Sequence, residues 1–191
     1  MGSLGILRYK THIVSSLTAG AGLSIMLNYP FHIGYVIGIC FGSLLPDIDE
    51  PRSFIGRRSF GLSKYVKQRY GHRGITHSLF AWMLVSFVFL IYPSFLTIGI
   101  SLGYLFHLIG DLFSIRSIPI LAPFKPVRPT LPFTYKTGSF TEDILLYIFT
   151  FLLFYFVFVY GKLYPYLIQS TVELVSSIIH ILMDYLKTIS N

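Results

Sequence analysis

Charged residues and cysteine are scarce in this sequence. Only 12% of its 191 residues are charged, whereas 53% are hydrophobic and 17% are aromatic. A soluble domain of this length carries about twice that share of charge. The excess apolar surface needs lipid as its solvent, which argues against a pair of soluble domains and indicates one integral membrane domain over residues 1–191. The single cysteine, Cys40, cannot form an internal disulfide.

The short motifs of several enzyme classes are also absent from the sequence. It contains no CxxC pair and no Walker-type phosphate loop, and its GxSxG match, Gly99–Gly103, lies inside the predicted helix 94–113 and not at the strand-to-helix turn of a nucleophile elbow. Nucleophilic catalysis by serine or cysteine is therefore the weaker interpretation. The net charge of +7 does not indicate a nucleic-acid partner, because most of the aromatic residues lie inside apolar spans and not on a basic surface.

Apolar runs bounded by proline, glycine and charge predict six helices. Two long connections, 47–74 and 114–139, join some of them, and tight turns join the others. The expected fold class is therefore all-α, a polytopic membrane bundle of about six helices. The predicted helices cover residues 11–27, 31–46, 75–92, 94–113, 140–161 and 165–187.

Basic residues gather on one side of this predicted bundle. If successive helices alternate in direction, one side holds the N-terminus, the connections 47–74 and 114–139, and the C-terminus; we call this side face A. Fourteen of the fifteen Lys and Arg residues fall on face A, and only Lys162 falls on the opposite side. Cytoplasmic segments carry such an excess. We therefore expect a multi-pass protein of the cell membrane with face A and both termini in the cytoplasm.

Histidine and carboxylate side chains also converge on face A, although they come from five different helices. Two of them, His107 and Asp111, are four residues apart and share one helical face. Ionisable groups at membrane depth are costly and mark functional sites. The candidate metal ligands are His12, Asp47, Asp49, His72, His77, His107, Asp111 and Glu142.

Imidazole nitrogens and carboxylate oxygens are typical ligands of zinc, manganese and iron. The set exceeds what one tetrahedral ion needs, so we expect two or more divalent ions, or one ion with catalytic groups; zinc is the first candidate and manganese the second. A bound ion lowers the pKa of a water ligand and polarises a phosphoryl or carbonyl oxygen. Asp49 or Glu142 would then orient the water, and Arg73 would stabilise charge on a phosphate.

Most parts of this pattern also have a structural explanation. Pro46–Asp49 could be a solvated helix end, and His107 with Asp111 could be a hydrogen-bonded pair. Glu142 could simply place a favourable charge at a helix N-terminus. The segment Gly71–Ser78 is the hardest to explain in this way, because two imidazoles flank an arginine within it.

Other polar residues are assigned to the membrane surface or to a polar helix face. His180 and Asp184 repeat the spacing of four residues, but a general polar stripe along the last helix explains them. His32 lies on the opposite side from face A and is assigned to the interface. The basic stretch 52–73 is expected to contact anionic lipid headgroups.

Four segments together resemble a known family. They are His12, Pro46–Asp49, His72–Ser78 and Gly103–Asp111. In this order they are similar to the YdjM-like family of membrane-bound metal-dependent hydrolases over residues 8–145. The resemblance implies a relationship to zinc-dependent phospholipase C and P1-type nucleases. It also implies a helical multi-metal phosphoesterase core, with the residues named above as its ligands and catalytic groups.

The function expected from the sequence is metal-dependent hydrolysis of a phosphoester in a membrane lipid or lipid-linked substrate, by metal-activated water. Two alternatives stay open: a transporter of metal ions or anionic lipids, and a membrane protein whose metal is structural or regulatory. Transport predicts polar groups that continue to the opposite side of the membrane. The sequence offers only His32 and Glu173 for that purpose.

Overall fold

The computed structural model describes residues 4–125, 127–161 and 163–190, and within these ranges the chain forms seven α-helices and no strand. A π-helical turn, Tyr155–Val159, extends α6, and 3-10 turns cover Leu45–Asp49, Gly56–Arg58 and Ile75–His77. The expected all-α class is confirmed. The helices are α1 Leu4–Leu27, α2 Ile33–Gly42, α3 Leu62–Tyr70, α4 Leu79–Leu90, α5 Phe95–Leu112, α6 Phe140–Phe154 and α7 Tyr164–Ser190.

All six predicted helices are present, but the count rises to seven because α3 lies inside the connection 47–74. Its sequence, LSKYVKQRY, has no apolar run, so the criterion that found the other helices could not find it. Three boundaries also differ clearly from the prediction, and the first is the start of α1, which begins at Leu4 and not at residue 11. The chain tightens into 3-10 turns after α2 and before α4, so that α2 ends at Gly42 and α4 begins at Leu79.

Three helices in the described ranges are long and apolar enough to cross a bilayer, namely Phe95–Leu112, Phe140–Val159 and Tyr164–Ile189. By contrast, α2 has 10 residues and α4 has 12. At 1.5 Å per residue they measure about 15 and 18 Å, well short of a hydrocarbon core of about 30 Å. The two therefore reach only part of the way through such a core.

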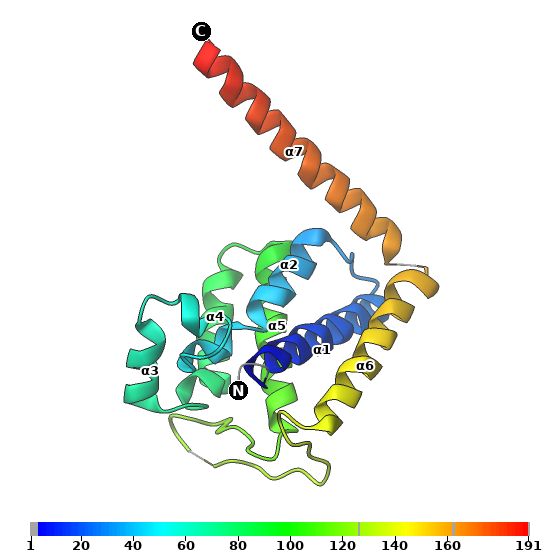
Figure 1. The fold of residues 1–191 in the computed structure, drawn as a ribbon. Helices are drawn as coiled ribbons and strands as arrows, with labels where there is room; N and C mark the ends of the chain where they lie inside the picture. Colours follow the sequence, from blue (N-terminus) through cyan, green and yellow to red (C-terminus); the bar gives the residue numbers. More distant parts are fainter. Residues whose placement is uncertain (1–3, 126, 162, 191) are drawn as a thin grey trace.

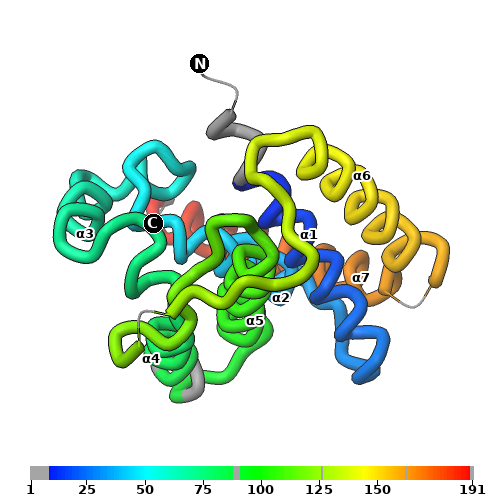
Figure 2. The backbone as a smooth tube through the Cα atoms, turned by 90° about the horizontal axis from the view of Figure 1, so that it is seen from below, coloured from blue at the N-terminus to red at the C-terminus, as the bar shows by residue number. Residues whose placement is uncertain are grey.

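Helix α5 lies at the centre of the bundle, with α1, α2 and α4 packed around it and α6 packed on α1 (Figure 1). Seen from below, the connection 114–139 passes over the end of α5 (Figure 2), and α3 lies toward the same, lower end of the bundle (Figure 1). This end gathers the face A segments with the exception of the C-terminus.

Helix α7 projects away from the bundle, and its C-terminal end lies far from the start of α1 (Figure 1). The shared cytoplasmic location of the two termini therefore remains a prediction. Lys162, the one basic residue expected opposite face A, lies outside the described residues.

Backbones touch where α2 packs on α5. Gly38 and Gly42 of α2 face Gly99 and Gly103 of α5, and a Cβ added to any of the four would lie only 2.1–2.4 Å from a backbone oxygen of the other helix. In both helices the glycines recur every fourth residue, a spacing that lets membrane helices approach closely. The contact holds the C-terminal end of α2 beside His107, one turn after Gly103.

Gly103→Ala is expected to destabilise the protein, because the new methyl group would overlap the backbone of α2. Overpacking of this kind costs about 1–3 kcal/mol, so thermal unfolding in detergent should move to lower temperature. Gly22→Ala is the matched control, since its Cβ would lie 3.6 Å from Phe156, an ordinary contact. Alanine also favours a helix over glycine by about 0.8–1.0 kcal/mol. Equal melting temperatures for the two variants would contradict the close contact.

Candidate metal centre

Ionisable side chains from three helices, two 3-10 turns and the turn 71–74 gather at one end of the bundle, where α5 ends. Asp47 is the most accessible of the central ones, with 19% of its side chain exposed. The others are shielded from solvent by the helices and by the connection 114–139. The buried members are His12, Asp49, Arg73, His77, His107, Asp111 and Glu142.

Four ligand-type atoms face one another at the centre of this cluster. His77 Nε2 lies 3.3 Å from Asp111 Oδ2 and 3.6 Å from Asp47 Oδ1. His107 Nε2 lies 3.6 and 3.9 Å from the same two oxygens. A tetrahedral zinc ion at about 2.0–2.2 Å from each ligand keeps the ligand atoms about 3.4 Å apart. The four nitrogen–oxygen separations, 3.3–3.9 Å, are close to this value.

Three of these atoms are buried without a hydrogen-bond partner among the described residues: His77 Nε2, His107 Nε2 and Asp111 Oδ2. An unpaired buried polar atom costs about 1–3 kcal/mol. Three such atoms aimed at one point are difficult to explain by packing alone. A shared cation would satisfy all three at once, and the donor set matches the preferences of zinc.

The opposite nitrogen of each central imidazole is held by the protein. His107 Nδ1 donates to the carbonyl of Ser43 at 2.6 Å, directly after α2. His77 Nδ1 lies 3.2 Å from Asp49 Oδ2. Metal-binding histidines are commonly oriented in this way by a carbonyl or a carboxylate. The arrangement turns both Nε2 atoms toward Asp47 and Asp111.

Both oxygens of Asp49 are engaged away from the four central atoms. Oδ1 pairs with His72 Nδ1 at 3.0 Å, and Oδ2 accepts from the backbone N–H of Arg73 at 2.9 Å and from Thr76 Oγ1 at 2.7 Å. The structure thus places Asp49 and His72, both candidate ligands from the sequence, behind His77. His72 lies at the edge of the cluster with 30% of its side chain exposed.

In this region, burial shifts the pKa of a side chain in one direction, and its contacts with oppositely charged neighbours shift it in the other. Burial disfavours the charge on Asp49, but hydrogen bonds with His72 and His77 outweigh it and hold the pKa of the carboxyl well below its usual range. Burial likewise disfavours the charge on His77, but the nearby carboxylates of Asp47 and Asp49 outweigh it and raise the pKa of His77 to about 9. The carboxylates around His77 therefore stabilise positive charge on its ring.

Arg73 adopts a left-handed backbone conformation, with φ of 55°, which is costly for a residue with a side chain. In this conformation its guanidinium donates to Asp111 Oδ1 at 2.6 Å and to Ser114 Oγ at 2.7 Å. Arg128 donates to the carbonyl of Arg73 at 3.0 Å and links it to the connection 114–139. Arg73 is thus buried against Asp111, whereas a phosphate clamp would need its guanidinium to face a substrate.

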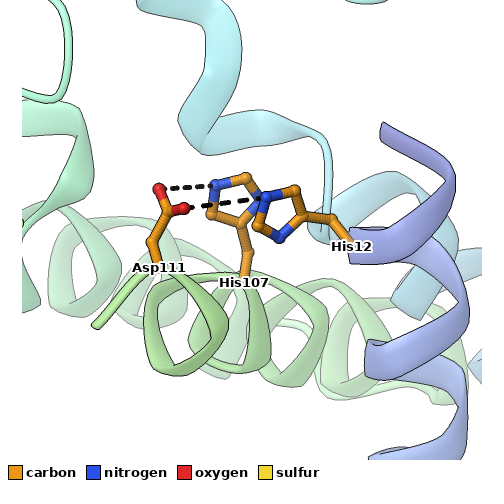
Figure 3. Close-up of side chains that lie close together, drawn as sticks. All are labelled: His12, His107 and Asp111. Carbon is orange, nitrogen blue, oxygen red and sulfur yellow. Dashed lines mark ion pairs between the residues drawn. The ribbon is translucent and has the colours of Figure 1, made fainter. Parts of the chain in front are cut away.

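His12 joins the cluster from α1 (Figure 3). Its ring stacks on that of His107, with 3.9 Å between centroids, and its Nε2 lies 3.7 Å from Asp111 Oδ1. The two imidazoles reach different oxygens of Asp111 (Figure 3). Ligand atoms of these three residues all lie within 4.8 Å of one another, as do those of Asp47, His77 and His107.

Glu142 lies in the first turn of α6 and is buried. Its Oε2 accepts from the backbone N–H of Gly138 at 2.5 Å. Its Oε1 is buried without a hydrogen-bond partner in the described part of the chain. A charge at a helix N-terminus accounts for its position, but it does not account for the unpartnered oxygen.

Residues set aside on sequence grounds lie away from this cluster. His180 and Asp184 pair at 3.1 Å on α7 with 81% and 58% of their side chains exposed. His32 accepts from the backbone N–H of Gly34 at the start of α2 and stacks on Phe95. The sequence argument missed Ser43 and Ser114, because a backbone carbonyl and a serine hydroxyl carry no recognisable pattern.

The fold and the cluster together define a helical membrane protein with a buried histidine–aspartate centre at one end of its bundle. A family model described as YdjM inner membrane protein matches residues 7–168. The chain belongs to this family, which confirms the resemblance to YdjM; the relationship to metal-dependent hydrolases remains a prediction.

Curated relatives agree with this assignment. Protein YvsG of Bacillus subtilis (strain 168) is 33% identical over 139 residues, which cover 72% of this chain and 86% of that protein. Inner membrane protein YdjM of Escherichia coli (strain K12) and of Shigella flexneri is 41% identical over 87 residues, 42% of this chain and 44% of each relative. The chain thus matches less than half the length of the two YdjM proteins. No solved structure matches.

Arg73→Met is expected to lower the free energy of unfolding by about 3–5 kcal/mol, because it leaves a buried carboxylate without its cation. Lys67→Met is the matched control, since it removes the lysine of a more exposed pair with Glu50, 2.7 Å apart, and should cost about 0–1 kcal/mol. Denaturant unfolding in micelles, with a chelator present, measures both. Equal decreases in the free energy of unfolding for the two variants would show that Arg73 does not stabilise the buried carboxylate.

Proposed function

We propose that the cluster binds a divalent cation, with zinc as the first candidate and manganese as the second. Asp47, His77, His107 and Asp111 would hold it. The observation that carries this proposal is the convergence of three buried ligand atoms that have no hydrogen-bond partner in the described residues. Imidazole and carboxylate donors at these separations suit a tetrahedral ion.

A second ion would need different atoms of the same cluster. His107 has one nitrogen left for a metal, because Ser43 engages the other. His12 and Asp111, whose Nε2 and Oδ1 lie 3.7 Å apart, are the candidates for holding it. Glu142 is the candidate for completing this second set through its buried Oε1. This arrangement uses six of the eight ligands expected from the sequence.

The proposed reaction is hydrolysis of a phosphoester in a membrane lipid or lipid-linked substrate. When bound, a divalent ion would lower the pKa of a water ligand toward neutrality and polarise a phosphoryl oxygen. Glu142 is the stronger candidate for orienting the water, since both oxygens of Asp49 are engaged. Asp49 would position His77, and Arg73 would position Asp111.

The location of the cluster supports a substrate that resides in the membrane. The centre lies at one end of a bundle that contains candidate membrane spans, where a lipid phosphate would be found. The excess of basic residues on face A favours a cytoplasmic location for this end. Phe60 and Tyr65 are exposed within the basic stretch 52–73, which suits contact with anionic headgroups.

The transport hypothesis is less well supported. The buried ionisable side chains of the described residues lie at one end of the bundle, whereas transport predicts such groups at several depths. His32, the candidate from the sequence at the other end, caps α2. The activity measurement below distinguishes a structural role of the metal from a catalytic one.

His77→Ala and His107→Ala are each expected to weaken zinc binding strongly, because each removes one of the four central ligand atoms. His180→Ala is the matched control: it lies four residues before an aspartate, as His107 does, but on the exposed surface of α7. Metal per chain is measured by elemental analysis after dialysis against limiting zinc. Full metal content in His107→Ala would overturn the proposed centre.

Glu142→Gln is expected to lower kcat by about 10²–10⁴-fold, the range for loss of an acid–base group, with the ion at Asp47, His77, His107 and Asp111 retained. Asp49→Asn should instead weaken metal binding by about 10–100-fold and regain activity at higher zinc. Release of phosphate or headgroup from a panel of phospholipids is the measurement, with chelator added to abolish it. Glu173→Gln, on the exposed part of α7, is the control. Bound metal without turnover across the panel would contradict the enzyme proposal.

A further inference from the structure

A cavity of about 600 Å³ lies directly beside the metal centre. It is open on one side and is lined by residues of α1 between His12 and Ala19, of α5 from Phe106 with Phe113 directly after that helix, and of α6 between Thr141 and Phe149, with part of the segment 133–135 beside them. We call it the apolar slot. Its volume falls within the range of about 300–1,000 Å³ that is typical of small-molecule sites. His12 belongs both to its lining and to the ionisable cluster.

The apolar slot is elongated along the helix axes. Lining residues recur four positions apart on each helix, as in Ser15 with Ala19 and Leu145 with Phe149, so that each helix contributes one face. On α1 the lining runs from His12 to Ala19, a rise of about 10 Å. The polar cluster lies at the start of this run, and Ala19 lies at the far end.

The directions of the other two helices agree with this orientation. Helix α5 ends at the metal centre, so Phe113 lies near it and Phe106 lies deeper in the bundle. Helix α6 begins at that end, so Thr141 lies near it and Phe149 lies deeper. The apolar slot therefore runs from the candidate metal centre alongside α5 and α6, two helices that are long and apolar enough to span the membrane.

This combination matches the chemistry of an amphiphile. The deep part is lined by aromatic and aliphatic side chains, including Phe106, Leu145 and Phe149, while the near end has an imidazole beside the proposed cation site. Around a membrane-spanning helix, hydrocarbon chains are the surrounding solvent. An apolar cavity that opens there will be occupied by such chains, because water would have no polar partners in its deep part.

We propose that the apolar slot binds one acyl chain of a bilayer phospholipid and so holds its phosphate at the metal centre. The placement of the phosphate rests on the proposed function; the binding of the chain does not. The slot thus selects substrates by their hydrocarbon part, and a water-soluble phosphoester lacks the contacts that the slot provides.

The test uses the full chain reconstituted in phosphatidylethanolamine–phosphatidylglycerol vesicles that contain a phospholipid with a diazirine on one acyl chain. After irradiation, labelled peptides are mapped by mass spectrometry. Adducts are expected on 106–113 and 141–149, on the sides that line the slot, and unlabelled phospholipid should compete with them. They should persist with chelator, because binding of the chain does not require the metal.

Ala19→Phe is expected to fill the deep end of the apolar slot. Adducts on the lining residues should fall by about tenfold, which corresponds to ~1.4 kcal/mol of lost affinity. Ser176→Phe makes a comparable change on the exposed surface of α7 and should leave these adducts unchanged. The labelling of the unaltered protein tests the proposal independently, should Ala19→Phe fail to fold.

The outcomes separate this proposal from the proposed reaction. Saturable adducts in the apolar slot without any turnover would support acyl-chain binding and would contradict the proposed hydrolase function. Turnover of a water-soluble phosphoester without slot adducts would keep the hydrolase and overturn the slot. Adducts spread evenly over the lipid-facing helices, α7 included, would also overturn it. Stronger competition by a polyprenyl phosphate than by phospholipid would overturn the assignment to an acyl chain.

Discussion

Backbone lies against backbone where α2 packs on α5, because glycines line both sides of the contact. The close contact between the two backbones places the end of α2, and the carboxylates that follow it, beside His107. It brings the Ser43 carbonyl to His107, and the chain after Ser43 turns directly into Leu45–Asp49, which carries two carboxylates. A side chain between the helices would move the two halves of the cluster apart. The contacts of His77 and His107 with Asp47 depend on this short separation.

Charge balance within the cluster accounts for features that would otherwise be costly. Buried carboxylates need cations or hydrogen-bond donors nearby, and Arg73 meets this need only in a strained backbone conformation. The strain is sustained by contacts of Arg73 with Asp111, Ser114 and Arg128. The connection 114–139 thus closes the cluster and also holds its main permanent cation.

The sequence predicted which residues meet, but not what each does there. Alternating helix direction was enough to bring His12, His107 and Asp111 to one end. It could not show that Asp49 faces away from the central atoms, since that depends on which oxygen meets which donor. The helix α3 escaped detection because it has no apolar run. The glycines of α2 and α5 did form a visible pattern of small residues, whose meaning depends on knowing that the two helices are neighbours.

Asp111 is shared by several interactions at once. One oxygen contacts Arg73 and lies near His12, and the other faces His77 and His107. The free energies of substitutions at these positions will not add, because residues in one network are energetically coupled by about 0.5–3 kcal/mol. A single replacement of Asp111 therefore reports on the whole network. Only double-mutant cycles, pairing Asp111 with each neighbour in turn, can assign the individual contributions.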